Sequence, residues 1–167
     1  MEIVYIDMDG VLCDYNAAKN EGLKRNPEQK FPQSEIGFFE NLNPIENAIE
    51  SINYLKSIEH IDVYILTAPS VKNPHCYTEK RLWIEKHLGI DMTEKLIITA
   101  NKGLNKGEYL IDDHISGKGQ ENFEGIILQF GSEKFPSWKE ILTHLDLKNN
   151  GKNVDSSDDT NPTDNNN

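Results

Sequence analysis

The sequence predicts an α/β protein with a three-layer, Rossmann-like parallel sheet and a small helical cap insertion. Short apolar runs of strand composition alternate with segments of helical periodicity through most of the chain, an order that favours a parallel sheet covered by helices. Polar residues follow several of these runs, at the edge of the sheet where such folds bind ligands. With 167 residues and 37% hydrophobic content, the chain can form one domain with its own core.

The first predicted strand covers residues 3–6 and runs directly into Asp7, Met8, Asp9 and Gly10. Carboxylates are costly to bury unless a positive group pairs with them, so two acids at a strand end indicate a reactive edge. Gly10 favours a bend that presents the main-chain oxygen of Asp9. The alternatives are a surface turn or a calcium loop. The calcium loop fails because its twelfth position requires a glutamate and the chain has Ala18 there.

The remaining elements follow from periodicity and capping signals. Residues 15–26 have helical composition and residues 27–43 do not, so residues 15–43 are predicted to form a reduced cap within a core domain of residues 1–147. Asn43-Pro44-Ile45-Glu46 carries a helix-start signature and predicts a helix from residue 44 to residue 58. Further strands are expected at 62–66, 95–99, 109–111 and 125–130, and further helices at 74–88 and from residue 138.

Composition narrows the possible partners. The formal charge of −11 argues against a nucleic-acid polymer as partner, because its phosphates would be repelled. No segment is long and apolar enough for a membrane span, and we expect no signal peptide, no disulfide framework and a cytoplasmic location. Residues 148–167 are rich in Asn and Asp and are predicted to form a disordered tail.

Polar residues end or follow four of the predicted strands: Asp7, Asp9, Thr67, Lys102, Asp112 and Asp113. Acids that converge repel one another unless a cation joins them. All the donors are hard oxygens, which favours Mg²⁺ over other metals. A threonine hydroxyl and a lysine suit phosphate oxygens, so the set indicates phosphoryl transfer.

Taken in order, Asp7-Met8-Asp9-Gly10-Val11, Thr67, Lys102 and Asp112-Asp113 resemble the four motifs of the haloacid dehalogenase superfamily of phosphatases. A two-component receiver domain uses similar residues but places its lysine last, whereas Lys102 precedes the acidic pair here. More narrowly, the chain is similar to the 5'(3')-deoxyribonucleotidase family. The segments that carry this similarity are Tyr5–Asp14, Leu66–Pro69, Cys76–Lys80, Trp83–Gly89, Leu110–Asp113 and Phe135–Ile141.

The resemblance implies a role for each motif residue. Asp7 would be the nucleophile that forms an aspartyl-phosphate, and Asp9 the acid and base. Thr67, Ala68 and Lys102 would bind the phosphate. Mg²⁺ would be held by Asp7, the Asp9 carbonyl and one acid of the last motif. Sequence does not fix which one; we expect Asp113, with Asp112 supporting it.

The chain departs from the family pattern at the cap and at the third motif. The interval between Asp7 and Thr67 is short for an inserted cap, and Ala100 stands where an arginine is usual. Phe38 and Phe39 fall where cap aromatics would line the substrate pocket, or they pack the insertion onto the core. Lys72, Lys80 and Lys106 either draw phosphate toward the site or are ordinary exposed lysines, and we interpret them as the latter. His114 is either a neighbour of the metal site or a solvent-facing residue.

Together these observations predict a Mg²⁺-dependent phosphatase that hydrolyses deoxyribonucleoside monophosphates. The alternatives are a phosphatase for another small phosphate ester, since the cap is reduced, and a catalytically silent phosphate-binding module. A homodimer in which a second subunit covers the open site is also expected.

Overall fold

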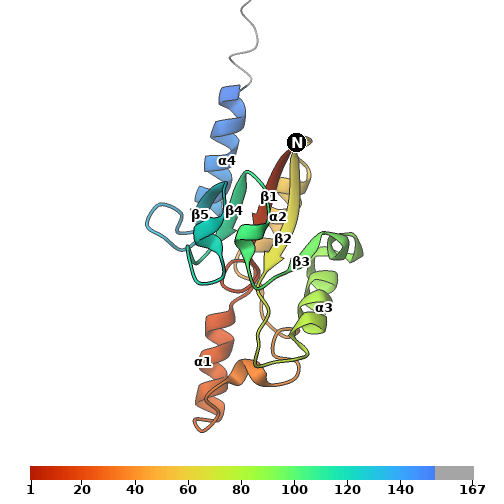
Figure 1. The fold of residues 1–167 in the computed structure, drawn as a ribbon, viewed down its shortest axis with the longest axis vertical. Coiled ribbons are helices and arrows are strands. Elements are labelled where there is room, and N and C mark those ends of the chain that lie inside the picture. Colours follow the sequence, from red (N-terminus) through yellow and green to blue (C-terminus); the bar gives the residue numbers. More distant parts are fainter. Residues whose placement is uncertain (153–167) are drawn as a thin grey trace, which may run out of the picture.

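The computed structural model describes the backbone of residues 1–152 and the side chains of residues 1–146. It has the α/β architecture that the sequence predicts, a five-stranded parallel sheet with helices packed on it (Figure 1). The last helix continues to Lys152, beyond the predicted boundary at residue 147, and the rest of the predicted tail lies outside the described residues. Within the described part, no helix has the length and apolar character needed to cross a bilayer.

The strands lie in the order β3-β2-β1-β4-β5. Their bounds are β1 Glu2–Ile6, β2 Ile61–Thr67, β3 Leu96–Ile98, β4 Tyr109–Asp112 and β5 Ile126–Gln129. The chain passes from β1 to β2 and β3 on one side, then crosses to β4 and β5 on the other. The order therefore reverses at β1, and a parallel sheet opens a ligand crevice at the carboxyl ends of the strands beside such a reversal.

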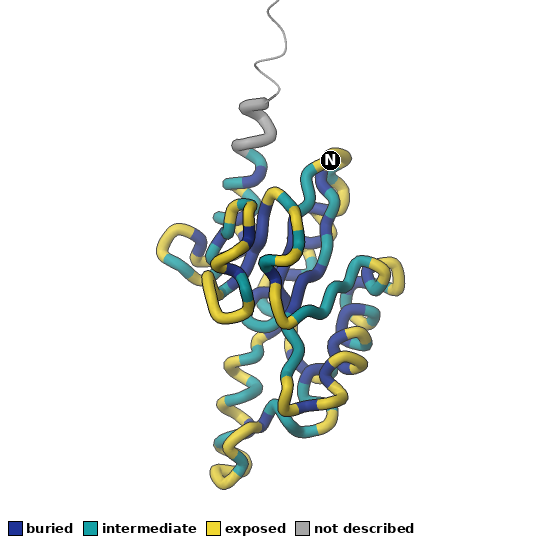
Figure 2. Tube along the Cα trace, in the orientation of Figure 1, coloured by how far each residue is buried: buried dark blue, intermediate teal, exposed yellow. Residues whose placement is uncertain are grey.

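Three helices cover one face of the sheet: α2 (Ala48–Lys56), α3 (Cys76–Leu88) and α4 (Trp138–Lys152). α2 contacts both α3 and α4, so the three lie side by side. Buried residues of the strands and of these helices form the main core, which lies among the dark blue segments in Figure 2. Each large apolar side chain buried there contributes about 1.5–3 kcal/mol, which makes this layer a rigid support for the strand ends.

The opposite face is covered by irregular chain and short 3₁₀ turns. Tyr5, Leu66, Leu110 and Phe123 form a second, smaller core there. The Tyr5 hydroxyl donates to the carbonyl of Lys106 at 3.0 Å, which holds the connection before β4 against the sheet. The third layer is therefore thin, and it is built from the segments that carry residues 102 and 120 to the sheet edge.

The helix predicted from residue 44 begins later, at Ala48. The preceding backbone pairs with the segment after β1: Asp14 N–H donates to Asn43 O at 2.9 Å, and Ile45 N–H donates to Leu12 O at 2.8 Å. These tertiary bonds hold residues 43–45 in a bridge instead of a first helical turn. Local capping chemistry was overridden by pairing with a distant segment, which the sequence pattern does not reveal.

α1 (Tyr15–Arg25) and the chain that returns from it project beyond the carboxyl edge of the sheet (Figure 1). Asp14 caps α1 by accepting a hydrogen bond from Ala17 N–H at 2.9 Å. The return segment includes a 3₁₀ turn at Pro32–Ser34, which contacts α1. A Cβ added at Gly22 would lie 2.6 Å from the Pro32 Cβ, so a glycine lets the two segments cross closely. Residues 15–43 thus form a small projection beside the strand ends.

Candidate active site

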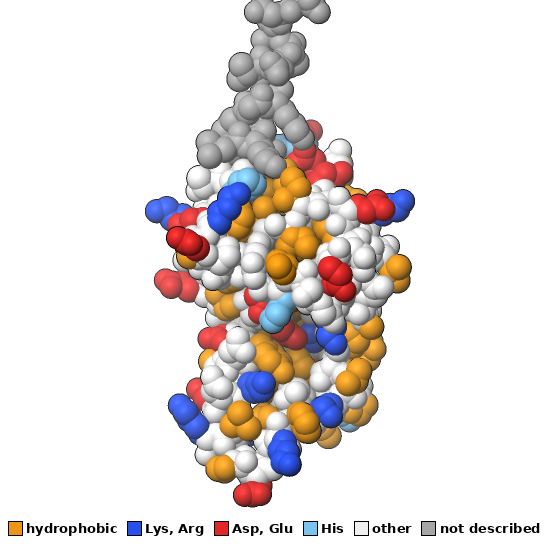
Figure 3. Space-filling model, turned by 60° about the vertical axis from the view of Figure 1, so that its left-hand side comes forward, with side chains coloured by type: hydrophobic (Ala, Val, Ile, Leu, Met, Phe, Trp, Pro, Cys, Tyr) orange, Lys and Arg blue, Asp and Glu red, His pale blue; other side chains and the backbone are white. Residues whose placement is uncertain are grey.

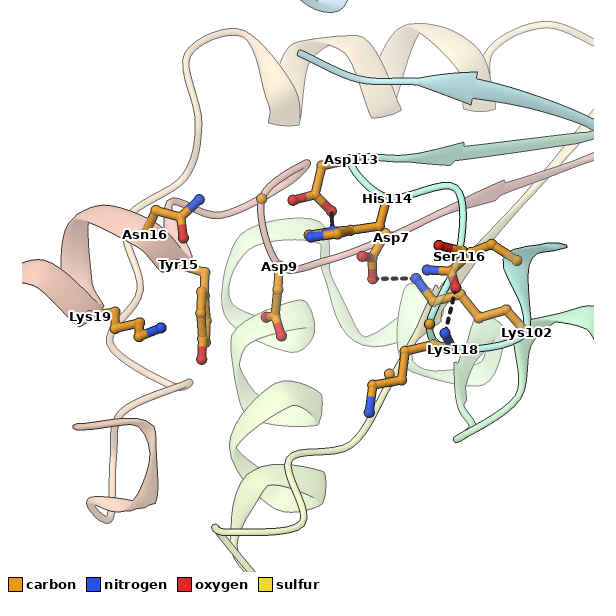
Figure 4. A pocket seen from close by; sticks show the side chains of 14 residues that line it. Asp7, Asp9, Tyr15, Asn16, Lys19, Lys102, Asp113, His114, Ser116 and Lys118 are labelled. Atoms are coloured by element: carbon orange, nitrogen blue, oxygen red, sulfur yellow. Dashed lines mark hydrogen bonds and ion pairs between the residues drawn. The ribbon is translucent and has the colours of Figure 1, made fainter. Parts of the chain in front are cut away.

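A cavity of about 440 Å³ opens between the strand ends and α1 (Figure 4). Figure 3 shows acidic side chains, a histidine and lysines meeting in the hollow between the sheet and the projection. The lining residues come from the first loop and α1 (Asp7, Asp9, Gly10, Tyr15, Asn16, Lys19), from the segments after β2 and β3 (Ala68, Lys102), and from the loop after β4 (Asp113, His114, Ser116, Gly117, Lys118, Gln120).

Asp7 is fixed at the end of β1. Its N–H donates to Ile111 O at 2.8 Å, which extends the pairing of β1 with β4 by one residue. Its Oδ1 accepts from Met8 N–H at 2.7 Å and lies 2.9 Å from Lys102 Nζ. Among the described residues nothing bonds to Oδ2. One oxygen of Asp7 is therefore held by donors, and the other is left for chemistry in the cavity.

Lys102 is buried between two carboxylates. Its Nζ lies 2.5 Å from Asp112 Oδ2, in addition to its contact with Asp7. Burial lowers the pKa of Lys102, but the charges of Asp7 and Asp112 outweigh burial and raise it above the ordinary lysine value. Lys102 therefore stays an ammonium. Burial, followed by repulsion from Asp7, raises the pKa of Asp112 despite the opposing effect of Lys102.

The two acids at the end of β4 face different ways. Asp112 is fully buried, and both its oxygens are engaged: Oδ1 by His114 N–H at 2.9 Å, and Oδ2 by Lys102 and by Gln120 Nε2 at 3.2 Å. Asp113 lines the cavity, with its Oδ1 2.8 Å from His114 Nδ1. Burial and the charge of Asp7 raise the pKa of Asp113, and the hydrogen bond to Asp113 raises that of His114.

Gly10 makes room for Asp113. Its φ of 81° lies in the left-handed region, and an added Cβ would stand 2.5 Å from Asp113 Oδ2. Any other residue would suffer both backbone strain and a clash with this carboxylate. The glycine that the sequence interprets as a bend is therefore also the point where the first and last motifs touch.

Lys80, on α3, is wrongly interpreted from sequence as an ordinary exposed lysine. It is fully buried, and its Nζ lies 2.9 Å from Asp9 Oδ2, 2.7 Å from Thr67 Oγ1 and 2.9 Å from Ala68 O. Burial raises the pKa of Asp9, Lys80 opposes this, and Asp7 adds to it. A signal for Lys80 was present: it shares one helical face with Cys76, Trp83 and Ile84, all of them buried.

The predicted phosphate-binding residues do not all face the cavity. Lys102 and Ala68 line it. Thr67 is fully buried at the end of β2, and its hydroxyl accepts the hydrogen bond from Lys80. In this arrangement Thr67 lies behind Lys80, and Lys80 stands between the threonine and Asp9.

Phe38 and Phe39 do not line the cavity. Phe39 is 1% exposed and belongs to the main core, while Phe38 packs edge-on against Phe39 at 5.1 Å and borders a separate cavity of about 230 Å³ beside α1. Both rings pack the projection onto the core, the alternative that the sequence left open. The aromatic residue that lines the main cavity is Tyr15, the first residue of α1, which no sequence motif singled out.

The donors that face the cavity suit a small, hard cation. Asp7 and Asp113 both line it, and the charge of Asp7 adds to burial in raising the pKa of Asp113. Crowded carboxylates with raised pKa values are stabilised by a divalent cation, and oxygen donors are those that Mg²⁺ prefers. Asp112 is excluded from such a role by its bonds to Lys102, Gln120 and His114.

A parallel sheet in this strand order, with aspartates at the ends of β1 and β4 around a buried lysine, is an α/β Rossmann-like fold consistent with the haloacid dehalogenase superfamily. The sequence model of the family described as 5' nucleotidase, deoxy (pyrimidine), cytosolic type C protein (NT5C) matches residues 25–141. The chain therefore belongs to the 5'(3')-deoxyribonucleotidase family, as the motifs predict.

Individual relatives with this family's name are similar to the chain over most of its length. A Vibrio phage KVP40 protein assigned as a 5'(3')-deoxyribonucleotidase is 36% identical over 150 residues, covering 88% of this chain and 86% of the relative. The human cytosolic 5'(3')-deoxyribonucleotidase is 31% identical over 168 residues, covering 83% and 78%. A Bordetella pertussis protein with the same assignment as the phage protein is 31% identical over 153 residues, covering 75% and 82%.

Proposed function

We propose that this chain is a Mg²⁺-dependent phosphatase that hydrolyses deoxyribonucleoside monophosphates through an aspartyl-phosphate on Asp7. One observation carries the proposal: Asp7 and Lys102 line the same cavity, and the Lys102 ammonium lies 2.9 Å from Asp7 Oδ1, which leaves Oδ2 free. Relatives named 5'(3')-deoxyribonucleotidase support the class of substrate.

Two buried lysines supply the positive charge for the phosphoryl group. Lys102 is held by Asp7 and Asp112, so its ammonium lies beside the attacking carboxylate. Lys80 is held by Thr67 and Ala68 on the far side of Asp9. Preorganised charges of this kind stabilise the charge that develops in the transition state without reorganising. In this proposal Lys102 and Ala68 contact phosphate oxygens, and Thr67 acts by orienting Lys80.

Asp7 and Asp9 divide the chemistry. Asp7 Oδ2 forms a bond to phosphorus while the bond from phosphorus to the sugar oxygen breaks, and Asp9 gives its proton to that leaving oxygen. Asp9 then takes a proton from the water that attacks phosphorus, which releases phosphate and restores the Asp7 carboxylate. Burial and the charge of Asp7 raise the pKa of Asp9, as a proton donor requires.

Asp7, the Asp9 carbonyl and Asp113 are the proposed ligands of Mg²⁺. When bound, the cation would neutralise phosphate charge and the repulsion among these acids. Asp113 is preferred over Asp112 because it lines the cavity, whereas Asp112 is occupied by Lys102 and Gln120. The role left to Asp112 is to hold Lys102 in place.

The cavity walls beyond the phosphate site belong to α1 and to the loop after β4. Tyr15, Asn16 and Lys19 face Ser116 and Lys118 across the opening, and a sugar and base would lie between them (Figure 4). A second candidate function, hydrolysis of another small phosphate ester, is favoured by the absence of Phe38 and Phe39 from these walls.

Phosphate release from a panel of monophosphates, with and without Mg²⁺, tests the proposal. Turnover of dUMP or dTMP well above sugar phosphates, lost on chelation and in Asp7→Asn, is the expected result. Broad weak turnover would favour the second candidate. No release, with Asp7→Asn equal to the parent, would identify a catalytically silent module. Light scattering of the same sample measures whether the predicted homodimer forms.

A further inference from the structure

Glu79 is a buried carboxylate next to Lys80 that the proposed chemistry does not use. It is 4% exposed, and among the described residues it has no cationic partner within ion-pair distance. Its Oε1 accepts from Gly37 N–H at 2.7 Å, and its Oε2 accepts from Phe39 N–H at 3.0 Å and from Asn73 Nδ2 at 3.2 Å. Neutral donors alone therefore compensate its burial.

Two of these donors belong to the backbone of the projection. Gly37 has a φ of 85°, a turn that is easiest for glycine and that precedes the second donor, Phe39. Asn73 is also fully buried, and its Nδ2 donates to Glu35 O at 3.1 Å as well as to Glu79. One carboxylate and one amide thus bind the return segment of the projection at residues 35, 37 and 39.

The segment held by Glu79 supports both sides of the active site. Phe39, whose N–H binds Glu79, stacks its ring on Tyr15 at 6.2 Å and 26°. The same ring lies 5.0 Å from the Nζ of Lys80. Tyr15 lines the cavity and Lys80 binds Asp9. A shift of Phe39 would therefore move a wall of the cavity relative to the phosphate site.

α3 also holds the end of the projection at a second point. Trp83, one turn after Glu79 and fully buried, donates from Nε1 to Leu42 O at 2.7 Å. This bond, together with the burial of Phe39, keeps the projection attached when the Glu79 carboxylate is changed. The two residues of α3 thus act on different parts of the segment, because Trp83 anchors its end and Glu79 sets the conformation of residues 37–39.

We infer that Glu79 is a positioning residue for nucleotide turnover: it docks residues 37–39 on α3 and so fixes Tyr15 relative to Lys80 and Asp9. The predicted effect on nucleotide turnover rests on the proposed function. The docking of the segment on Glu79 rests on the hydrogen bonds alone. Glu79 acts through Phe39, and the part of the substrate that it affects is the nucleoside, not the phosphoryl group.

Glu79→Gln keeps the size of the side chain but turns an amide N–H₂ toward backbone N–H groups, so at least one hydrogen bond is lost. In the full chain, amide hydrogen exchange at Gly37 and Phe39 should quicken by about tenfold or more. The KM for dTMP should rise about tenfold with a smaller change in kcat, while kcat/KM for acetyl phosphate, too small to reach Tyr15, should stay within about twofold. Glu85→Gln, on the same helix, is the matched control. It should change neither the amide exchange at Gly37 and Phe39 nor the KM for dTMP.

Phe39→Leu separates the two steps, because it keeps the backbone N–H that binds Glu79 and removes the ring. It should raise the KM for dTMP while exchange at Gly37 stays slow, and it serves equally if Glu79→Gln does not fold. Unchanged exchange in Glu79→Gln, an unchanged KM in either variant, or an equal loss with both substrates would overturn the inference. Failure of the parent chain to hydrolyse dTMP would instead reject the proposed function. Amide hydrogen exchange at Gly37 and Phe39 would still test whether Glu79 docks this segment.

Discussion

Replacing Lys80 with methionine tests the most unexpected contact in the site. Methionine keeps an unbranched side chain but removes the ammonium. The change leaves Asp9, Thr67 and the Ala68 carbonyl without a donor that lies within 2.9 Å of each in the parent. The variant is expected to be less stable and much less active, for separable reasons.

The size of the stability loss follows from burial. Removing one partner of a buried ion pair costs about 3–5 kcal/mol, because the other charge is left uncompensated. The side chain of Asp9 is 26% exposed, so water can reach it and the lower end of this range applies. A loss of about 3 kcal/mol lowers Tm by about 6–12 °C in a domain of this size. Loss of a preorganised charge beside the phosphoryl group should reduce kcat by about 10²–10³-fold.

Calorimetry and phosphate release from dTMP measure the two effects. Lys86→Met, on the exposed side of the same helix, is the matched control and should stay within about 0.5 kcal/mol of the parent. If Lys80→Met melts within about 2 °C of the parent and retains its kcat, then Lys80 neither stabilises Asp9 nor serves the phosphate, and the proposed site is wrong at its α3 side.

Three further predictions concern the other side of the site. Asp112→Asn should cost about 3 kcal/mol in urea unfolding, because Lys102 loses a buried partner; equal stability would show that Asp7 alone holds this lysine. Gly10→Ala should cost about 1–3 kcal/mol and weaken Mg²⁺ binding in calorimetry, because its Cβ meets Asp113 Oδ2 at 2.5 Å; normal Mg²⁺ affinity would exclude Asp113 as a ligand. Burial foremost raises the pKa values of Asp9, Asp112 and Asp113, so the folded chain keeps protons that the unfolded chain has lost. Without Mg²⁺, stability should therefore fall as pH rises from about 4 to about 7, and the rise in Tm on adding Mg²⁺ should grow over the same range; a rise independent of pH would contradict this.

The sequence predicts the sheet well because β1, β2 and β4 are buried where they end and read as short apolar runs. It predicts the acids and Lys102 because each follows a strand, where topology alone brings them together. Lys80 escapes prediction because it belongs to a helix, where a lysine is usually exposed, and its partners are distant in sequence. The pattern of buried neighbours on α3 is a local sign of its position.

The errors elsewhere have a common cause in tertiary contacts. Residues 43–46 carry a helix-capping signature, but the backbone of Asn43 and Ile45 is hydrogen-bonded to Asp14 and Leu12 instead. Phe38 and Phe39 carry the right chemistry for stacking on a base, but the reduced projection uses them to attach itself to the core. Tyr15 takes the cavity position because α1 starts directly after the loop that carries Asp7 and Asp9.

Trapping the covalent intermediate tests the central claim most directly. The chain is mixed with dTMP and Mg²⁺, quenched in acid during turnover and treated with borohydride, which reduces an aspartyl-phosphate to homoserine. Peptide mass spectrometry should then find homoserine at position 7, and neither at Asp9 nor in a sample without substrate. Phosphate release with unmodified Asp7 in every peptide, or with the modification at another aspartate, would contradict the account.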